Sequence, residues 1–192
     1  MFSTNDYNTL IETFVSQQYL WLISGLRPNT VAIDIGAHCG DSAIYLAQQN
    51  GIEKVFAYDN DENVAVRGIN MLNKATQKVR EKIRYSLAEV VGDETLPKGF
   101  VLQVPHISLA GILENIRSPV VIKCDCEGAE HRIFGENMGD AMQHVYRIQI
   151  EYHNGAQNLK ARLEKSGFKV TVAKPWTHDA KLGEVGWLYA EK

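Results

Sequence analysis

The sequence predicts an α/β fold, with a seven-stranded, mostly parallel sheet, helices on both faces and an antiparallel hairpin at one sheet edge. Apolar strand-like runs alternate with helical segments from residue 30 to about residue 166, and this order favours right-handed crossovers and parallel pairing. The last two strand-like runs, Lys169–Ala173 and Val185–Ala190, have no helical pattern between them and should form a hairpin. With 192 residues, 45% of them hydrophobic, the chain can bury the core of one domain.

Each element is predicted from a local pattern. Thr9–Ile23 carries apolar residues at helical spacing, so residues 1–27 are expected to form a helical cap on a domain of residues 28–192. The other strands are predicted at Thr30–Ile35, Lys54–Tyr58, Lys82–Leu87, Pro119–Cys124 and Arg147–Tyr152. The other helices are predicted at Asp41–Gln49, at Glu62 to about Lys74, at Leu109–Ile116, from Ala129 and at Gln157–Lys165, with a loop at Gly92–Gly99.

Composition and charge argue against several classes of function. The net charge is −3 and the 20 Lys and Arg residues are spread thinly, so no basic surface and no nucleic-acid partner are expected. The first 26 residues lack the pattern of a signal peptide, and no apolar run approaches the length of a membrane span. Three cysteines, an odd number, indicate reduced thiols. A cytoplasmic protein is therefore expected.

A glycine turn follows the first predicted strand, in the segment Asp34–Asp41 (DIGAHCGD). Its glycines are spaced G-x-x-x-G, with His38 where a dinucleotide fingerprint has its middle glycine, so pyrophosphate and a nicotinamide cofactor are disfavoured. A carboxylate at Asp34 suits a cationic ligand, such as the amino or sulfonium end of S-adenosylmethionine. Asp59 ends the next strand, where it could accept hydrogen bonds from ribose hydroxyls or cap the following helix.

A second group of polar residues follows the fourth predicted strand, in Val120–Glu130 (VVIKCDCEGAE). Asp125 and Glu127 stand at the strand's end, and crowded carboxylates cost free energy unless a cation or a reaction uses them. Glu130 falls in the first turn of the next helix, where the helix dipole favours an anion.

The fifth predicted strand ends in Glu151 and His153, two residues that share a face. If the fourth and fifth strands are neighbours, Asp125, Glu151 and His153 should converge within a few ångströms. Such a group suits general-base catalysis on a hydroxyl or an amine. The alternative is a polar cluster that only holds two loops together.

These segments together resemble the FkbM family of S-adenosylmethionine-dependent methyltransferases. VAIDIGAHCG is similar to that family's D-x-G-A-N-x-G turn, VVIKCDCEGAEHRIFG to its K-x-D-x-E-G-A-E stretch, and Ile150–His153 to its E-x-H strand end. VPHISLAGIL, Val104–Leu113, is similar to a family S-L-D-x-L segment, although Ala110 replaces the acid. The resemblance covers residues 30 to about 155. It implies the Rossmann-like class I methyltransferase fold.

The resemblance also implies the site residues and the reaction. The predicted cofactor-binding residues are Asp34, Gly36, Ala37, His38, Gly40, Asp59, Asn60, Ala88 and Glu89. His38 departs from the family's asparagine. Family members mostly methylate hydroxyls of small molecules, so O-methylation of a small-molecule acceptor by in-line methyl transfer is expected. Asp125, Glu127 and His153 are the predicted catalytic residues, with the role of accepting the proton.

Two alternatives stay open at this point. In a metal-assisted O-methyltransferase, Asp125, Glu151 and His153 would hold Mg²⁺, but Mg²⁺ prefers oxygen ligands and the histidine argues against it. No metal ligand is therefore predicted. A non-catalytic nucleoside-binding module would keep the glycine turn but would not need the second group of carboxylates. The acceptor pocket is expected to be walled by residues 92–106 and 174–183, which do not name a substrate.

Overall fold

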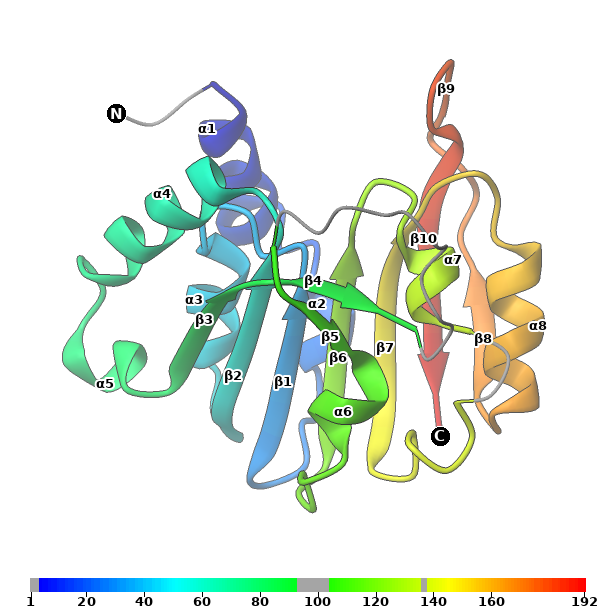
Figure 1. Cartoon of the computed structure of the whole chain (residues 1–192), viewed down its shortest axis with the longest axis horizontal. Coiled ribbons are helices and arrows are strands. Elements are labelled where there is room, and N and C mark those ends of the chain that lie inside the picture. The colour runs from blue at the N-terminus through cyan, green and yellow to red at the C-terminus, as the bar shows by residue number, and fades with distance from the viewer. Residues whose placement is uncertain (1–3, 93–103, 136–137) are drawn as a thin grey trace.

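The main sheet has the strand order β3-β2-β1-β6-β7-β10-β8, and β9 pairs with the protruding end of β10 (Figure 1). The structure is a computed structural model that describes residues 4–92, 104–135 and 138–192. The strands are β1 Thr30–Ile35, β2 Ile52–Asp59, β3 Ile83–Leu87, β6 Val120–Asp125, β7 Val145–Tyr152, β8 Lys169–Val172, β9 Thr177–Asp179 and β10 Gly183–Glu191. The predicted α/β fold is confirmed.

Parallel pairing joins β3, β2, β1, β6 and β7, whereas β10 runs antiparallel to both β7 and β8. The predicted hairpin therefore exists, with β10 inserted between β7 and β8. All six residues of β1 are buried, as is typical of a central strand with helices on both faces.

Helices cover both faces of the sheet. On one face, α6 Leu109–Leu113, α7 Glu130–Ile133 and α8 Gln157–Lys165 pack against Ile33, Ile122 and Ile148. On the other face, α2 Leu20–Ile23, α3 Asp41–Ala47 and α4 Glu62–Leu72 pack against Ala32 and Val121. Alternate residues of each strand thus feed two separate cores, because successive side chains point to opposite faces.

The amino-terminal segment differs from the single helix predicted at Thr9–Ile23. It forms α1 Thr4–Leu10, a π-helical turn η1 Ile11–Val15 and then, after a break, α2. Gln17 in the break has a φ of 51°, in the left-handed region, where a helix cannot continue. α1 lies beside α4 at the carboxyl end of the sheet (Figure 1). The expected division into a cap of residues 1–27 and a domain of residues 28–192 stays a prediction.

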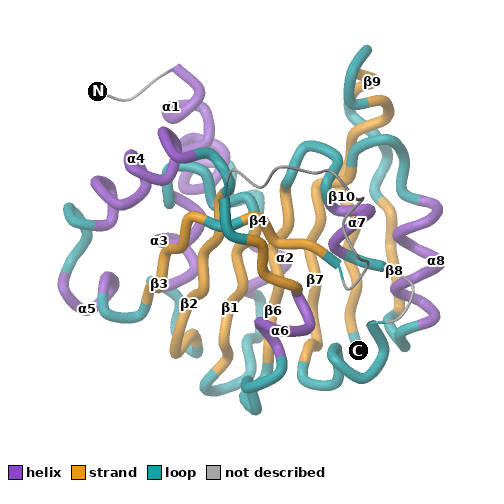
Figure 2. The backbone as a smooth tube through the Cα atoms, in the orientation of Figure 1, coloured by secondary structure: helices purple, strands orange, loops and turns teal. Residues whose placement is uncertain are grey.

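Four further elements were not predicted. They are α5 Gln77–Arg80, β9, and a two-stranded parallel ribbon of β4 Glu89–Val91 and β5 His106–Ser108. Figure 2 shows this ribbon in front of the main sheet. The loop predicted at Gly92–Gly99 lies, apart from Gly92, outside the described residues. Among the helices of the described ranges, none has the length and hydropathy that a bilayer span requires.

The sheet order places the two polar segments side by side. β1 lies between β2 and β6, and β6 pairs with β7. The chain leaves β1 toward one side of the sheet and β6 toward the other, so the ends of these two strands form the switch point of the topology. Ligands of open α/β sheets bind in the crevice at such a point.

Candidate functional site

A cavity of about 1040 Å³ lies along the carboxyl ends of β1, β2, β6 and β7. Six of the nine predicted cofactor residues line it, namely Gly36, His38, Asp59, Asn60, Ala88 and Glu89. Of the three predicted catalytic residues, Asp125 and Glu127 line it. Asp34, Ala37, Gly40 and His153 do not line the cavity, and all four are buried.

Gly36 brings the end of β1 into direct contact with the end of β6. Its φ is 73°, and a Cβ at this position would lie 1.8 Å from the carbonyl oxygen of Asp125. Its own carbonyl accepts a hydrogen bond of 2.5 Å from Nζ of Lys123. Only glycine meets both requirements, a left-handed conformation and a missing side chain. The cavity floor between the two polar segments depends on this contact.

Asp59 joins the glycine turn to the end of β2. One carboxylate oxygen accepts a hydrogen bond of 2.9 Å from the backbone N–H of His38, and the other accepts one of 2.9 Å from the N–H of Asp61. Asp61, not Asp59, is the N-cap of α4, because its side chain accepts from Asn63 and Val64. Asp59 therefore lines the cavity with lone pairs still available on both oxygens.

Asp34 forms a buried ion pair with Lys123. Nζ of Lys123 lies 3.2 Å from Asp34 Oδ1, and Ser42 donates a hydrogen bond of 2.6 Å to Oδ2. Burial raises the pKa of Asp34, while Lys123 and Ser42 act in the opposite direction. Asp34 thus holds Lys123 under the glycine turn and does not line the cavity, and its predicted contact with a ligand stays a prediction. Removing one member would leave an uncompensated buried charge.

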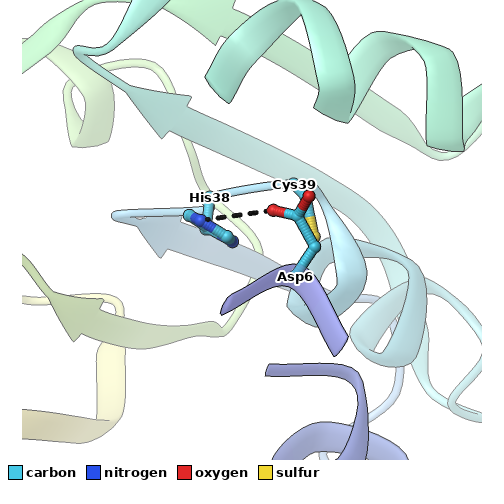
Figure 3. A group of neighbouring side chains, drawn as sticks. All are labelled: Asp6, His38 and Cys39. Carbon is cyan, nitrogen blue, oxygen red and sulfur yellow. Dashed lines mark ion pairs between the residues drawn. The ribbon is translucent and has the colours of Figure 1, made fainter. Parts of the chain in front are cut away.

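The amino-terminal segment is fastened over the glycine turn. Asp6 of α1, whose side chain is fully buried, lies 3.6 Å from Nε2 of His38 and 3.2 Å from Nε of Arg67 on α4. Figure 3 shows Asp6 reaching from α1 toward His38, with Cys39 behind it. Deeper in the segment, Thr13 donates a hydrogen bond of 2.6 Å to Asp41. His38 is therefore held by the protein itself as well as lining the cavity.

The far end of the cavity is bounded by Ala88 and Glu89. The carboxylate of Glu89 lies 3.1 Å from Nε2 of His106 and 3.1 Å from the guanidinium of Arg132. These contacts tie β4, β5 and α7 together beside the cavity. Ala88 is small and buried, and it lines the cavity.

The ends of β6 and β7 bring the second polar group together as predicted. Asp125 and Glu151 are register partners on the two strands, and ligand atoms of Asp125, Glu151 and His153 all lie within 4.8 Å of one another. Glu127 follows in the turn with a φ of 48° and lines the cavity. The distance between Glu151 and Nε2 of His153 is 3.9 Å.

Glu130 organises this group from behind. It is fully buried, and its carboxylate accepts hydrogen bonds from the backbone N–H of Gly128 at 2.9 Å and of His153 at 2.6 Å. Nδ1 of His153 lies 3.0 Å from the same carboxylate. Because a carboxylate accepts hydrogen bonds, this contact favours a proton on Nδ1, and Nε2 faces Glu151. The helix-dipole role predicted for Glu130 is only part of what this residue does.

The ionisable side chains of this group have shifted pKa values. Burial and the neighbouring Asp125 raise the pKa of Glu151 to about 8. Burial also raises the pKa of Asp125, although Lys123 opposes this effect. Burial lowers the pKa of His153, but the Glu130 contact and the nearby carboxylates outweigh it and raise that pKa above its ordinary value. Buried groups with shifted pKa values that gather at a cavity are typical of functional sites.

Solved structures resemble this chain, whereas no protein-family model and no curated protein matches it. An rRNA methylase from Streptococcus thermophilus has a TM-score of 0.58 at 14% identity, over 93% of this chain and 95% of that one. A Streptococcus pneumoniae protein with a proposed tRNA (m1A22) methyltransferase activity, in complex with S-adenosyl-L-methionine, has a TM-score of 0.59 at 17% identity, over 91% of this chain and 72% of that one. The methyltransferase FkbM from Methylobacillus flagellatus has a TM-score of 0.63 at 19% identity, over 90% of this chain and 47% of that one.

The chain has a Rossmann-like methyltransferase fold. It spans about half the length of the FkbM structure, and membership of the FkbM family stays a prediction from the motifs.

Reasoning from the sequence did not identify three residues of this chain that lie at the site. Lys123 pairs with Asp34, the Tyr85 hydroxyl donates a hydrogen bond to the carbonyl of His38, and Glu12 of η1 lines the cavity. Lys123 could have been noticed as a charged residue in the middle of an apolar strand, since a buried lysine needs a partner. No sequence signal distinguishes Tyr85 or Glu12 from ordinary surface residues.

The three cysteines of this chain should differ sharply in their reactivity toward alkylating reagents. Cys39 and Cys124 are fully buried, and burial raises the pKa of both thiols, that of Cys39 to about 12. Cys126 is half-buried and lines the cavity. Because the thiolate is the reactive form, iodoacetamide should modify Cys126 in the native protein and leave the other two intact.

Peptide mass spectrometry after brief labelling checks this result, with Cys126→Ser as the control that should take up almost no label. Rapid native-state labelling of Cys39 would contradict the structure around the glycine turn.

Proposed function

We propose that this protein is an S-adenosylmethionine-dependent methyltransferase that acts on a small-molecule acceptor. One observation carries the proposal: a single cavity runs from Gly36 and Asp59 at the ends of β1 and β2 to Asp125 and Glu127 beyond the end of β6. It is large enough for a nucleoside cofactor together with a small acceptor. The bound S-adenosyl-L-methionine in the structurally similar Streptococcus pneumoniae protein supports this choice of cofactor.

The cofactor is proposed to lie across the ends of β1 and β2. Asp59 would accept hydrogen bonds from the ribose hydroxyls, and Ala88 and Glu89 would border the adenine. Gly36 and His38 would approach the methionine end, and Asn60 would close the cavity beside the ribose. Asp34, Ala37 and Gly40 would act indirectly, by shaping the turn from behind the cavity surface. The negative potential around Asp125 suits a sulfonium cation.

The lining also favours a small acceptor over a nucleic acid. It contains six carboxylates, those of Glu12, Asp59, Asp61, Glu89, Asp125 and Glu127, and two arginines, Arg67 and Arg132. Arg67 lies against Asp6 and Arg132 against Glu89, so neither is unpaired. A surplus of carboxylates repels a phosphate backbone. Methylation of RNA, the activity named for the Streptococcus thermophilus protein, is therefore the less favoured outcome.

In this mechanism, an acceptor hydroxyl attacks the methyl carbon in line with the departing sulfur. The methyl carbon is already activated by the sulfonium, so the protein's task is to align the reactants and to accept a proton. Alignment of this kind contributes roughly 7–11 kcal/mol. Asp125 and Glu127, which line the cavity, are proposed to orient the acceptor and take up its proton at the carboxyl end of β6, and His153, buried next to Asp125, is proposed to act through that carboxylate. The raised pKa of Asp125 favours proton uptake.

Binding of S-adenosylhomocysteine tests the cofactor part of the proposal. Isothermal titration should detect binding by the native protein, and Asp59→Ala should weaken it about tenfold or more, because a charge-assisted hydrogen bond contributes about 1.5–3 kcal/mol. Asp61→Ala is the matched control. It removes a neighbouring carboxylate that lines the same cavity and costs about 1 kcal/mol of helix capping, but should leave affinity nearly unchanged.

Tight binding of NAD with no response to S-adenosylhomocysteine would refute the cofactor assignment. Screening of small-molecule and RNA acceptors by mass then separates the two acceptor classes.

A further inference from the structure

We propose that Asp125, Glu151 and His153 bind a divalent transition-metal ion at the carboxyl ends of β6 and β7. The three side chains come from two neighbouring parallel strands, whose ends are fixed relative to one another by the strand register. Binding of the ion does not depend on the proposed methyl transfer. Only the role of the ion in orienting the acceptor rests on that proposed function.

The geometry places three suitable ligand atoms around one point. One oxygen of Asp125, one oxygen of Glu151 and one ring nitrogen of His153 all lie within 4.8 Å of one another. Metal–ligand bonds of this type are about 2.0–2.2 Å long, so neighbouring ligand atoms on one ion lie roughly 3.0–3.5 Å apart, about 1.5 Å closer than the 4.8 Å limit seen here. Small rotations of these side chains are therefore enough to bring all three onto an ion.

His153 is prepared as a ligand. Its side chain is 3% exposed, and Glu130 holds Nδ1 at 3.0 Å. Nε2 faces Glu151 at 3.9 Å, a distance beyond hydrogen bonding, and no other described residue forms a hydrogen bond with it. Metal-binding histidines nearly always donate their other ring N–H to a carboxylate or carbonyl, which fixes the ring and strengthens the ligand. Glu130 occupies that supporting position.

The local charge also calls for a cation. Asp125 and Glu151 bring two carboxylates together, and Glu130 adds a third, fully buried one behind His153. Lys123 lies against Asp34 at 3.2 Å and against the carbonyl of Gly36, and it offsets the charge of Asp125 only in part, because burial still raises the pKa of Asp125. Ionised carboxylates that lie close together at a half-buried site repel one another, and a cation bound between them removes this repulsion.

The mixed ligand set indicates the class of ion. Mg²⁺ and Ca²⁺ prefer oxygen ligands only, whereas imidazole together with carboxylates suits Mn²⁺, Fe²⁺, Co²⁺ or Zn²⁺. A second set with similar spacing, Asp6, His38 and Cys39, is a poor cation site because Arg67 lies 3.2 Å from Asp6. Burial and Asp41 also raise the pKa of the Cys39 thiol to about 12, so that the metal-binding thiolate is disfavoured.

The test is a titration of the chelator-treated protein, residues 1–192, with Co²⁺, monitored by calorimetry and by the visible absorption of the ion. One ion per chain should bind. His153→Ala and Glu151→Gln should each weaken binding by more than about 100-fold, and Glu130→Gln by about 10–100-fold as expected for a supporting residue. Glu127→Gln, which removes a carboxylate from the same cavity but not from the ligand set, should change affinity less than about fivefold. Cys39→Ser should behave like Glu127→Gln.

Circular dichroism establishes that each variant is folded, and S-adenosylhomocysteine binding is measured in parallel. Absence of one-to-one Co²⁺ binding would overturn the metal site. So would binding that survives His153→Ala and Glu151→Gln, or binding that is lost in Cys39→Ser. If Co²⁺ binds as described and S-adenosylhomocysteine does not, the metal site stands and the proposed function fails.

Discussion

Alanine in place of Gly36 is expected to destabilise the protein by about 4 kcal/mol or more, a loss large enough to unfold many proteins of this size. The added Cβ would lie 1.8 Å from the carbonyl oxygen of Asp125, and Gly36 has a φ of 73°. Backbone cannot yield as a flexible side chain does, so β1 and β6 would have to separate at the site. Thermal unfolding should show a fall of about 8 °C or more.

Gly25→Ala is the matched control for this prediction. Gly25 has a similar φ of 62°, but a Cβ there meets nothing within 4 Å. This variant should lose only the conformational term of about 1–2 kcal/mol. The difference between the two variants isolates the contact with Asp125. Equal losses would mean that this close approach of the two strands does not contribute to stability.

Substitution of His153 by alanine or of Asp125 by asparagine is expected to lower turnover by about 10²–10⁴-fold on an identified acceptor. Both residues lie at the carboxyl ends of β6 and β7, beyond the proposed position of the methyl group. A group that acts only in the transition state changes turnover and leaves cofactor affinity nearly unchanged. Steady-state kinetics and S-adenosylhomocysteine titration on the same preparations check the two halves of this prediction.

Glu127→Gln belongs in the same series, because Glu127 lines the cavity while His153 lies behind it. If all three variants keep full turnover and lose only thermal stability, the cluster is structural and the proposed catalytic roles are refuted. If chelation abolishes turnover and Co²⁺ or Mn²⁺ restores it, the loss in His153→Ala and Asp125→Asn is due to the missing ion.

The sequence alone determined the order of the main elements and the location of the two polar segments. Strand β1 at Thr30–Ile35 and helix α8 at Gln157–Lys165 begin and end where their patterns predict, because apolar runs and helical periodicity are local properties. The meeting of Asp125, Glu151 and His153 also followed from sequence. Parallel strands end at one edge of a sheet, so residues that follow neighbouring strands must converge there.

The tertiary structure alone decided which polar residues are free to meet a ligand. Asp34 and Asp59 both end strands and look equivalent in sequence, yet Asp34 is buried against Lys123 while Asp59 lines the cavity. The ion pair of Asp6 with Arg67 joins residues that lie far apart along the chain. Glu130 supports His153 across 23 residues. Pairings of this kind arise from packing, and packing is a property of the whole fold rather than of any local pattern.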